Sequence, residues 1–166
     1  MKALRLLPVV LPLLLVSAAC AAGPGPSASP GGSAGSSSSA HPPAGIPAFP
    51  PVADAEPTPV VATPGTQLAR DVRAQQLDVA LDGRHAYARL VWWSGVEPCN
   101  VLDSVTLQQT GSELFLTIRE GTTDPDAFCI ELAMLKSTIV DLGELEPGTY
   151  TISAFGDAAP LTIEVA

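Results

Sequence analysis

The carboxylates, histidines and cysteines are the side chains that could do chemistry in this chain. Asp124 and Asp126 lie two residues apart in the stretch TTDPDAF, residues 122–128. Two carboxylates with this spacing can join a calcium site. Calcium needs six or more oxygen ligands, however, and the stretch lacks the glycine and the distal glutamate of a calcium-binding loop. A solvated acidic loop is the favoured interpretation, and the two aspartates are weak candidates for a metal site.

Enzymatic chemistry finds little support in the rest of the sequence. A Ser-His-Asp site needs a histidine, and the C-terminal half of the chain has only His85, beside a hairpin turn. No G-x-S-x-G motif is present. The cysteines are not spaced as C-x-x-C, which argues against zinc and redox sites. The sequence therefore predicts a protein that is not an enzyme and uses no cofactor, and an enzyme with an unrecognised site is the less favoured alternative.

The first cysteine, Cys20, follows a stretch that is typical of an export signal. Lys2 and Arg5 give a positive start, nearly every residue from 6 to 16 is apolar, and small residues precede Cys20. The apolar run is too short for a membrane-spanning helix, which needs about 20 residues. Residues 1–19 are therefore predicted to be a signal peptide.

Residues 16–20, VSAAC, resemble the lipobox of bacterial lipoproteins, although Ser17 stands where that family usually has Leu. In that family the cysteine is acylated and becomes the new N-terminus. The resemblance implies that Cys20 holds the exported protein at the lipid bilayer, on the outer face of the cell membrane or at the outer membrane. An ordinary cleaved signal, which would give a secreted soluble protein, is the alternative.

A tether is predicted over residues 20–68. Of the 17 prolines in the chain, 11 lie between Pro24 and Pro64, among Gly, Ser and Ala. The segment 21–66 contains one Phe and no Trp, Tyr, Lys or Arg. Because such a composition cannot bury enough apolar surface to offset its ordering entropy, we expect a disordered spacer.

The charge of the chain argues against nucleic acid as a partner. Removing the signal removes two of the 8 basic residues, which leaves 6 basic against 17 acidic residues, a formal charge of −11. Binding to phosphates needs clusters of Lys and Arg. The acidic character suits solubility and would also suit a basic partner.

A folded all-β domain is predicted over residues 70–166. Seven short stretches with alternating or β-prone residues are separated by turn signals such as Asp82-Gly83, and this regular spacing favours a β-sandwich or barrel. The stretches are 72–81, 85–93, 103–109, 113–119, 137–143, 149–155 and 160–166. Residues 128–137 also contain helix-favouring side chains, so that stretch stays open between strand and helix.

One motif indicates the type of sandwich. Leu145, Pro147, Gly148 and Tyr150, in the stretch LGELEPGTY, resemble the tyrosine corner of immunoglobulin-like and fibronectin type III domains. The resemblance covers about 95 residues, 70–166. It implies a seven-stranded antiparallel sandwich in which the Tyr150 hydroxyl bonds to nearby backbone. A plain Pro-Gly hairpin turn is the alternative.

Strand direction predicts which loops meet. If direction alternates along the seven strands, the connections 94–101, 120–128 and 156–159 share one end of the sandwich. Cys99 lies in the first connection and Cys129 just after the second, so a disulfide between them is expected in an exported chain. The loops at this end are the expected contact surface.

Trp92 and Trp93 point to opposite faces of their predicted strand because neighbours on a strand alternate. Ala86, Ala88, Leu90 and Trp92 form the face predicted to be core. Tyr87, Arg89 and Trp93 lie on the other face, and an exposed strip of this kind can bind sugars, peptides or a protein. Cover of Trp93 by the tether or a loop is the alternative.

The sequence as a whole predicts a lipid-anchored, exported binding module with an envelope protein or glycan as its partner. An inhibitor or regulator of an extracytoplasmic enzyme is the alternative function.

The anchor gives the first testable prediction. Replacing Cys20 by Ser removes the thiol that would carry the lipid, so the C20S variant should move from the membrane fraction to the soluble exported fraction. Immunoblots of fractionated cells measure the change. A C20S protein that fractionates with the membrane like the parent would contradict the lipobox interpretation.

Overall fold

The computed structural model describes residues 45–53 and 55–166. These residues contain strands and no helix, so the domain is all-β as predicted. The nine strands of the described residues are β1 (Thr58–Pro59), β2 (Gln67–Val72), β3 (Gln76–Asp82), β4 (His85–Ser94), β5 (Val101–Thr110), β6 (Glu113–Thr122), β7 (Met134–Glu144), β8 (Gly148–Ala154) and β9 (Leu161–Val165).

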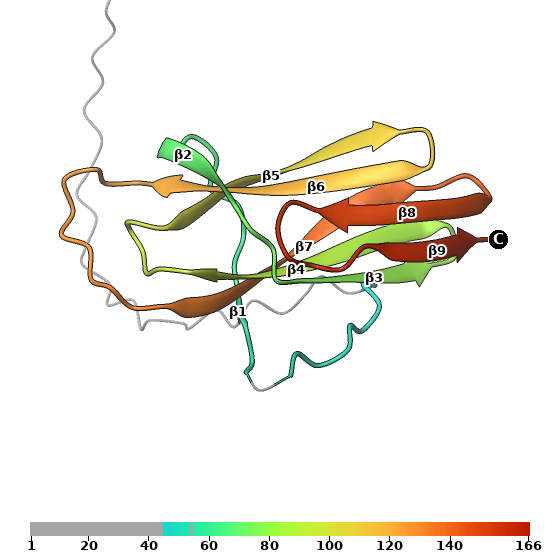
Figure 1. The fold of residues 1–166 in the computed structure, drawn as a ribbon, viewed down its shortest axis with the longest axis horizontal. Helices are drawn as coiled ribbons and strands as arrows, with labels where there is room; N and C mark the ends of the chain where they lie inside the picture. Colours follow the sequence, from blue (N-terminus) through green and yellow to red (C-terminus); the bar gives the residue numbers. More distant parts are fainter. Residues whose placement is uncertain (1–44, 54) are drawn as a thin grey trace, which may run out of the picture. The chain divides into compact units, whose positions relative to one another are not determined.

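The strands form two sheets, and the elongated sandwich runs along the strand direction (Figure 1). The first sheet has the order β1-β7-β4-β3. The second sheet has the order β2-β6-β8-β9, with β5 paired to β6. This arrangement is consistent with the predicted β-sandwich.

The core lies between the two sheets and follows the period of two that strands impose. In the first sheet, the alternating residues of β4 predicted to be core are fully buried: Ala86, Ala88, Leu90 and Trp92. In the second sheet, β6 contributes its own alternating set, Leu114, Leu116 and Ile118, each 0–1% exposed. The assignment of the core face of β4 is therefore confirmed.

The predicted count of seven strands is wrong by two. The seven predicted stretches correspond to β3–β9, and residues 128–133 are irregular chain that leads into β7. The additional strands, β1 and β2, arise from residues 58–72, most of which lie in the predicted tether. Residues 1–19, Cys20 and the tether up to residue 44 lie outside the described residues.

The sheets are also not purely antiparallel. β1 pairs with β7 in parallel, and β6 pairs with β8 in parallel through Glu113–Leu116 and Thr151–Ala154. In an immunoglobulin sandwich the third and sixth strands are neighbours. Here β6, the fourth of the seven predicted strands, takes the place of the third strand and pairs with β8, the sixth. Because direction alternates along these strands, the resulting pair must be parallel.

The segment before β2 passes from one sheet to the other and is held mainly by backbone groups. The Thr63 amide donates to the Leu102 carbonyl at 2.8 Å. The Asp103 carboxylate then accepts bonds from the amides of Gly65 and Thr66 at 3.0 and 2.9 Å, and from the Thr66 hydroxyl at 2.9 Å. These bonds lower the pKa of Asp103, the Thr66 hydroxyl contributing most.

Gly121 in β6 lets this segment approach the second sheet closely. A Cβ atom at residue 121 would lie 2.2 Å from the Thr66 hydroxyl oxygen and 2.5 Å from the Gln67 carbonyl oxygen. No side chain fits there unless the backbone of β2 moves. The glycine therefore permits β2 to pair with β6.

No helix among residues 45–53 and 55–166 is long and apolar enough to cross a membrane.

The Asp103 bonds give a prediction about pH. Because the folded-state pKa of Asp103 is below its ordinary value, its contribution is complete above the unfolded value of about 4 and is lost as the pH falls through the folded value. Amide-exchange protection factors at Gly65 and Thr66 should therefore fall on acidification below about pH 4.

The variant Asp103→Asn should lower the same protection factors at neutral pH, because an amide oxygen is a weaker acceptor than a carboxylate. The control is Asp82→Asn, since the Asp82 side chain accepts no hydrogen bond from the described residues. Equal protection at Gly65 and Thr66 in both variants would contradict this role of Asp103.

Candidate functional site

A buried acid–base pair lies between the sheets at one end of the core. The side chains of Glu120 in β6 and Lys136 in β7 are 2% and 3% exposed, and the Lys136 Nζ lies 3.6 Å from the Glu120 Oε1. Taking two charges out of water costs several kcal/mol per ion unless both gain close partners. The neighbours of the pair supply those partners.

Hydrogen bonds connect this pair to β4 of the first sheet and to the β4–β5 loop. The Glu120 Oε1 accepts bonds from the Trp92 indole at 2.9 Å and the Ser94 hydroxyl at 2.6 Å. The Lys136 ammonium donates to the Asn100 carbonyl at 2.5 Å, in the β4–β5 loop. We call Glu120, Lys136, Trp92 and Ser94 the buried network.

Sequence reasoning missed the buried network, although β6 carries a signal for it. Leu114, Leu116 and Ile118 alternate toward the core, and Glu120 is the next residue of the same series. A carboxylate at a core position of this period requires donors from the facing sheet.

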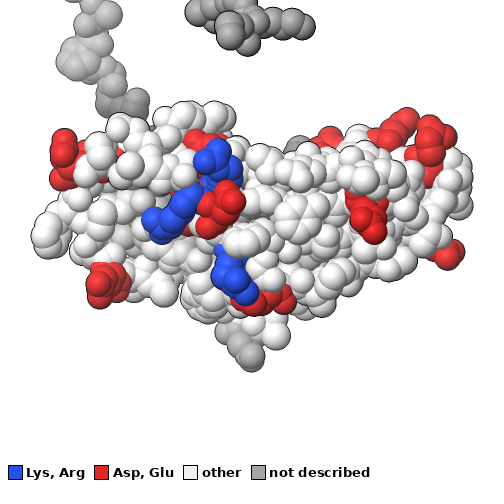
Figure 2. All heavy atoms as spheres, turned by 45° about the horizontal axis from the view of Figure 1, so that its top comes forward, with Lys and Arg blue, Asp and Glu red and all other residues white. Residues whose placement is uncertain are grey.

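An open cleft of about 480 Å³ lies above Glu120. Its lining includes Arg70 and Arg73 from the β2 side, Trp93 from β4 and Asn100 from the β4–β5 loop. The cleft forms where the chain leaves β2 in the second sheet and enters β3 in the first. Figure 2 shows one face of the molecule, on which basic side chains gather in one region with acidic neighbours, while the charged side chains elsewhere on that face are acidic.

The predicted disulfide is present. It joins Cys99 in the β4–β5 loop to Cys129 in the β6–β7 connection, with the Cα atoms 5.9 Å apart. These two connections therefore share one end of the sandwich. The third expected loop, 156–159, does not reach them. β8 pairs at its C-terminal end with Leu116, and β6 continues for six more residues, about 20 Å.

The β6–β7 connection, residues 123–133, exposes apolar side chains beyond the disulfide. Phe128 is 95% exposed, Ile130 58% and Leu132 53%. Leu68 lies beside the bridge, in a hollow that Cys99 and Cys129 also line. We call Phe128, Ile130, Leu132 and Leu68 the apolar tip.

Leu68 has a strained backbone. Its φ angle is 54°, in the left-handed region, and it lies where the register of β2 against β6 shifts. Bulky residues rarely adopt this conformation, and a β-bulge of this kind re-aims a side chain. Here the side chain is directed into solvent, 80% exposed.

The weak metal candidates in this connection take part in a local turn. The Asp124 carboxylate accepts a hydrogen bond from the Asp126 amide at 3.1 Å, and both residues are exposed. Within the described part of the chain, no group of three or more His, Cys, Asp or Glu residues is placed to hold a metal ion.

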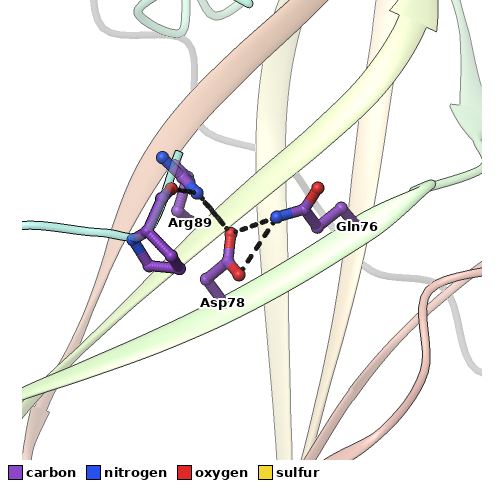
Figure 3. A network of polar contacts seen from close by, with 4 residues as sticks. Gln76, Asp78 and Arg89 are labelled. Carbon is purple, nitrogen blue, oxygen red and sulfur yellow. Dashed lines mark hydrogen bonds and ion pairs between the residues drawn. The ribbon is translucent and has the colours of Figure 1, made fainter. Parts of the chain in front are cut away.

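The predicted strip of Tyr87, Arg89 and Trp93 is open only at Trp93, which is 54% exposed. Arg89 is 14% exposed and forms an ion pair with Asp78 at 2.7 Å (Figure 3). Its guanidinium also lies over the Phe49 ring and donates to the Pro50 carbonyl. Part of the predicted tether therefore covers Arg89, which was not expected to be covered, and leaves Trp93 free.

The four residues predicted to form a tyrosine corner lie in the β7–β8 turn and at the start of β8, but the hydrogen bond that defines such a corner is not formed within the described residues. Leu145 is 4% exposed and its amide donates to the Arg84 carbonyl. Gly148, with a φ of 158°, follows Pro147 and begins β8. The Tyr150 ring packs against the core, but its hydroxyl makes no hydrogen bond with the described residues, because the ring is only half-buried and its hydroxyl can bond to water.

Comparisons of this chain with protein-family models, with curated proteins and with solved structures found no match. The site is therefore interpreted from its own geometry.

The buried network gives a prediction about stability. Glu120→Gln removes the charge that balances Lys136, and Lys136→Met leaves Glu120 unbalanced. Each variant should lose about 3–5 kcal/mol of unfolding free energy, measured by urea denaturation. The double variant should lose much less than the sum, because it leaves no buried charge unpaired.

The control is the exposed pair Arg84–Glu146, in which Glu146→Gln should change the unfolding free energy by less than about 1 kcal/mol. If the losses from Glu120→Gln and Lys136→Met simply add in the double variant, the two charges are not coupled.

Proposed function

We propose that this protein is an exported, lipid-anchored binding module that engages an envelope protein through the apolar tip. The observation that carries the proposal is the exposure of three large apolar side chains in one loop, with Phe128 at 95%. Single exposed apolar residues are ordinary, whereas several gathered at one point of an exported domain indicate a contact site.

The loop is held in place before any partner binds. The disulfide fixes Cys129, next to Phe128, against the β4–β5 loop. The Thr122 hydroxyl, just before the loop, donates to the Asp124 carbonyl at 2.8 Å. A loop restrained at this point loses less conformational entropy on binding than a free one. The strained backbone at Leu68 directs its side chain into solvent, and this side chain is the fourth apolar group beside the bridge.

Charge indicates the chemistry of the partner. Asp124, Asp126 and Glu131 accompany the apolar residues of the loop, and no basic residue lies between 123 and 133. A complementary surface would present an apolar pocket bordered by Lys or Arg. Such a surface belongs to a basic protein more readily than to an anionic membrane.

The immunoglobulin-like type of the sandwich is part of this proposal. The neighbours β3, β4 and β7 follow the order expected for strands A, B and E of such a fold, which supports it. The parallel pair β6–β8 departs from that pattern.

Inhibition of an extracytoplasmic enzyme is the second candidate function. Residues 128–133 form an irregular segment whose exposed side chains, led by Phe128, could enter a substrate groove. Both functions use the same surface, so the partner captured there distinguishes them.

A photoreactive phenylalanine analogue at position 128 tests the proposal in intact cells. Ultraviolet irradiation should give discrete adducts with one exported protein, identified by mass spectrometry. The matched control places the analogue at position 115, because Phe115 is also exposed, at 39%, but lies at the start of β6, away from the disulfide.

A second substitution, Ile130→Asp, should abolish the adduct at position 128 and change the unfolding free energy by less than about 0.5 kcal/mol, because Ile130 is largely exposed. Absence of an adduct at position 128, or an equal yield at position 115, would contradict the proposal.

A further inference from the structure

We propose that the cleft above Glu120 binds a saccharide that carries a carboxylate, such as a uronic acid unit of a polysaccharide. The cleft shares one lining residue, Arg70, with the hollow beside Leu68, but Trp93 and Glu120 line only the cleft, and its ligand is independent of the protein partner proposed above. Its volume of about 480 Å³ falls within the range of small-molecule sites. Three groups in it, an aromatic face, a guanidinium and a buried carboxylate, define the chemistry of the ligand.

Trp93 supplies a platform for a sugar ring. Its side chain is 54% exposed and lines the cleft, whereas its neighbour Trp92 is fully buried in the core. The face of an indole carries negative partial charge, and it attracts the weakly positive C–H groups on the apolar face of a pyranose ring. A large aromatic beside polar groups in an open cleft suits such a ring better than it suits a wholly apolar ligand.

Arg70 supplies the position for the carboxylate. Among the described Lys and Arg residues, five form ion pairs, namely Arg73, Arg84, Arg89, Arg119 and Lys136. Arg70 forms none, and within the described part of the chain its guanidinium makes one hydrogen bond, to the Asn100 side-chain oxygen at 3.1 Å. A guanidinium has five N–H donors and binds a carboxylate through two of them. Arg70 therefore has donors free for an acidic group.

Glu120 supplies an acceptor at the base of the cleft. Its three close contacts within the described residues, from Trp92, Ser94 and Lys136, all fall on Oε1. No fully buried side-chain oxygen of the described residues lacks a partner, so the free Oε2 retains contact with solvent. Because Glu120 lines the cleft, this oxygen can accept a bond from a sugar hydroxyl.

The edge of β4 adds main-chain groups. β3 begins at Gln76, so its pairing with β4 extends along β4 only as far as Val91. The Gln75 amide, just before β3, donates to the Val91 carbonyl. Backbone groups alternate between the two edges of a strand, so the N–H and C=O of Trp93 point to the same edge as those of Val91. No strand of the described residues pairs with Trp93 on that edge, and the edge faces the cleft.

Isothermal titration of the full chain in detergent, with the tetrasaccharide of galacturonic acid as probe, tests this proposal. The parent protein should bind it with a measurable Kd. Trp93→Ala and Arg70→Gln should each weaken binding at least tenfold. The matched control Arg84→Gln should bind like the parent, because Arg84 lies at the other end of β4 and is paired with Glu146.

Two further probes distinguish the parts of the ligand. The methyl ester of the tetrasaccharide keeps the rings and loses the charge, and inorganic phosphate keeps charge and loses the rings. Both should bind at least tenfold more weakly than the acid. The proposal is overturned if the acid does not bind, if the ester or phosphate binds equally well, or if Trp93→Ala and Arg70→Gln bind like the parent.

These results are independent of the apolar tip. The variant Ile130→Asp should leave tetrasaccharide binding unchanged, and Trp93→Ala should leave the cross-link at position 128 unchanged. Failure of the saccharide experiment therefore leaves the proposed protein contact standing, and failure of the cross-link leaves the saccharide site standing. A loss of both in either variant would show one continuous surface and overturn the assignment of a separate cleft.

Discussion

The contact between the Glu120 carboxylate and the facing sheet is the interaction on which this end of the molecule depends. Glu120 belongs to the second sheet, and all of its close partners, Trp92, Ser94 and Lys136, belong to the first. Apolar packing between sheets is non-directional, whereas these bonds require particular donors at particular positions. Lys136 extends the connection to the Asn100 carbonyl, and so to the loop that contains the disulfide. The buried network thus positions both candidate surfaces.

β2, which precedes the strands that the sequence predicts, provides one wall of the cleft. β2 pairs with β6 because Gly121 leaves room for Thr66 and because Asp103 satisfies the amides at the crossing. The strand then crosses to the first sheet through residues 73–75. Without β2, Glu120 would lie at an open edge between the sheets, so the cleft depends on a strand that lies outside the seven predicted ones.

The two candidate surfaces differ in how they would hold a ligand. The apolar tip offers exposed hydrocarbon on a restrained loop, and its energy would come from removing that surface from water. The cleft offers directional groups, Arg70 and the free oxygen of Glu120, around one aromatic face, and its specificity would come from hydrogen bonds. An exported module with both could bind a protein and a polysaccharide at once, because Phe128 lies in the β6–β7 connection and Trp93 lies in β4.

The sequence by itself determined the all-β class, the approximate positions of β3–β9, the core face of β4 and the Cys99–Cys129 bridge. Local alternation, turn residues and strand direction carry that information. Only the tertiary structure decided that residues 58–72 join the sheets, because backbone hydrogen bonds and a carboxylate hold them, and composition does not record either. It also decided that β6 lies beside β8 and that Glu120 meets Lys136, since long-range pairing depends on which edge a hairpin offers.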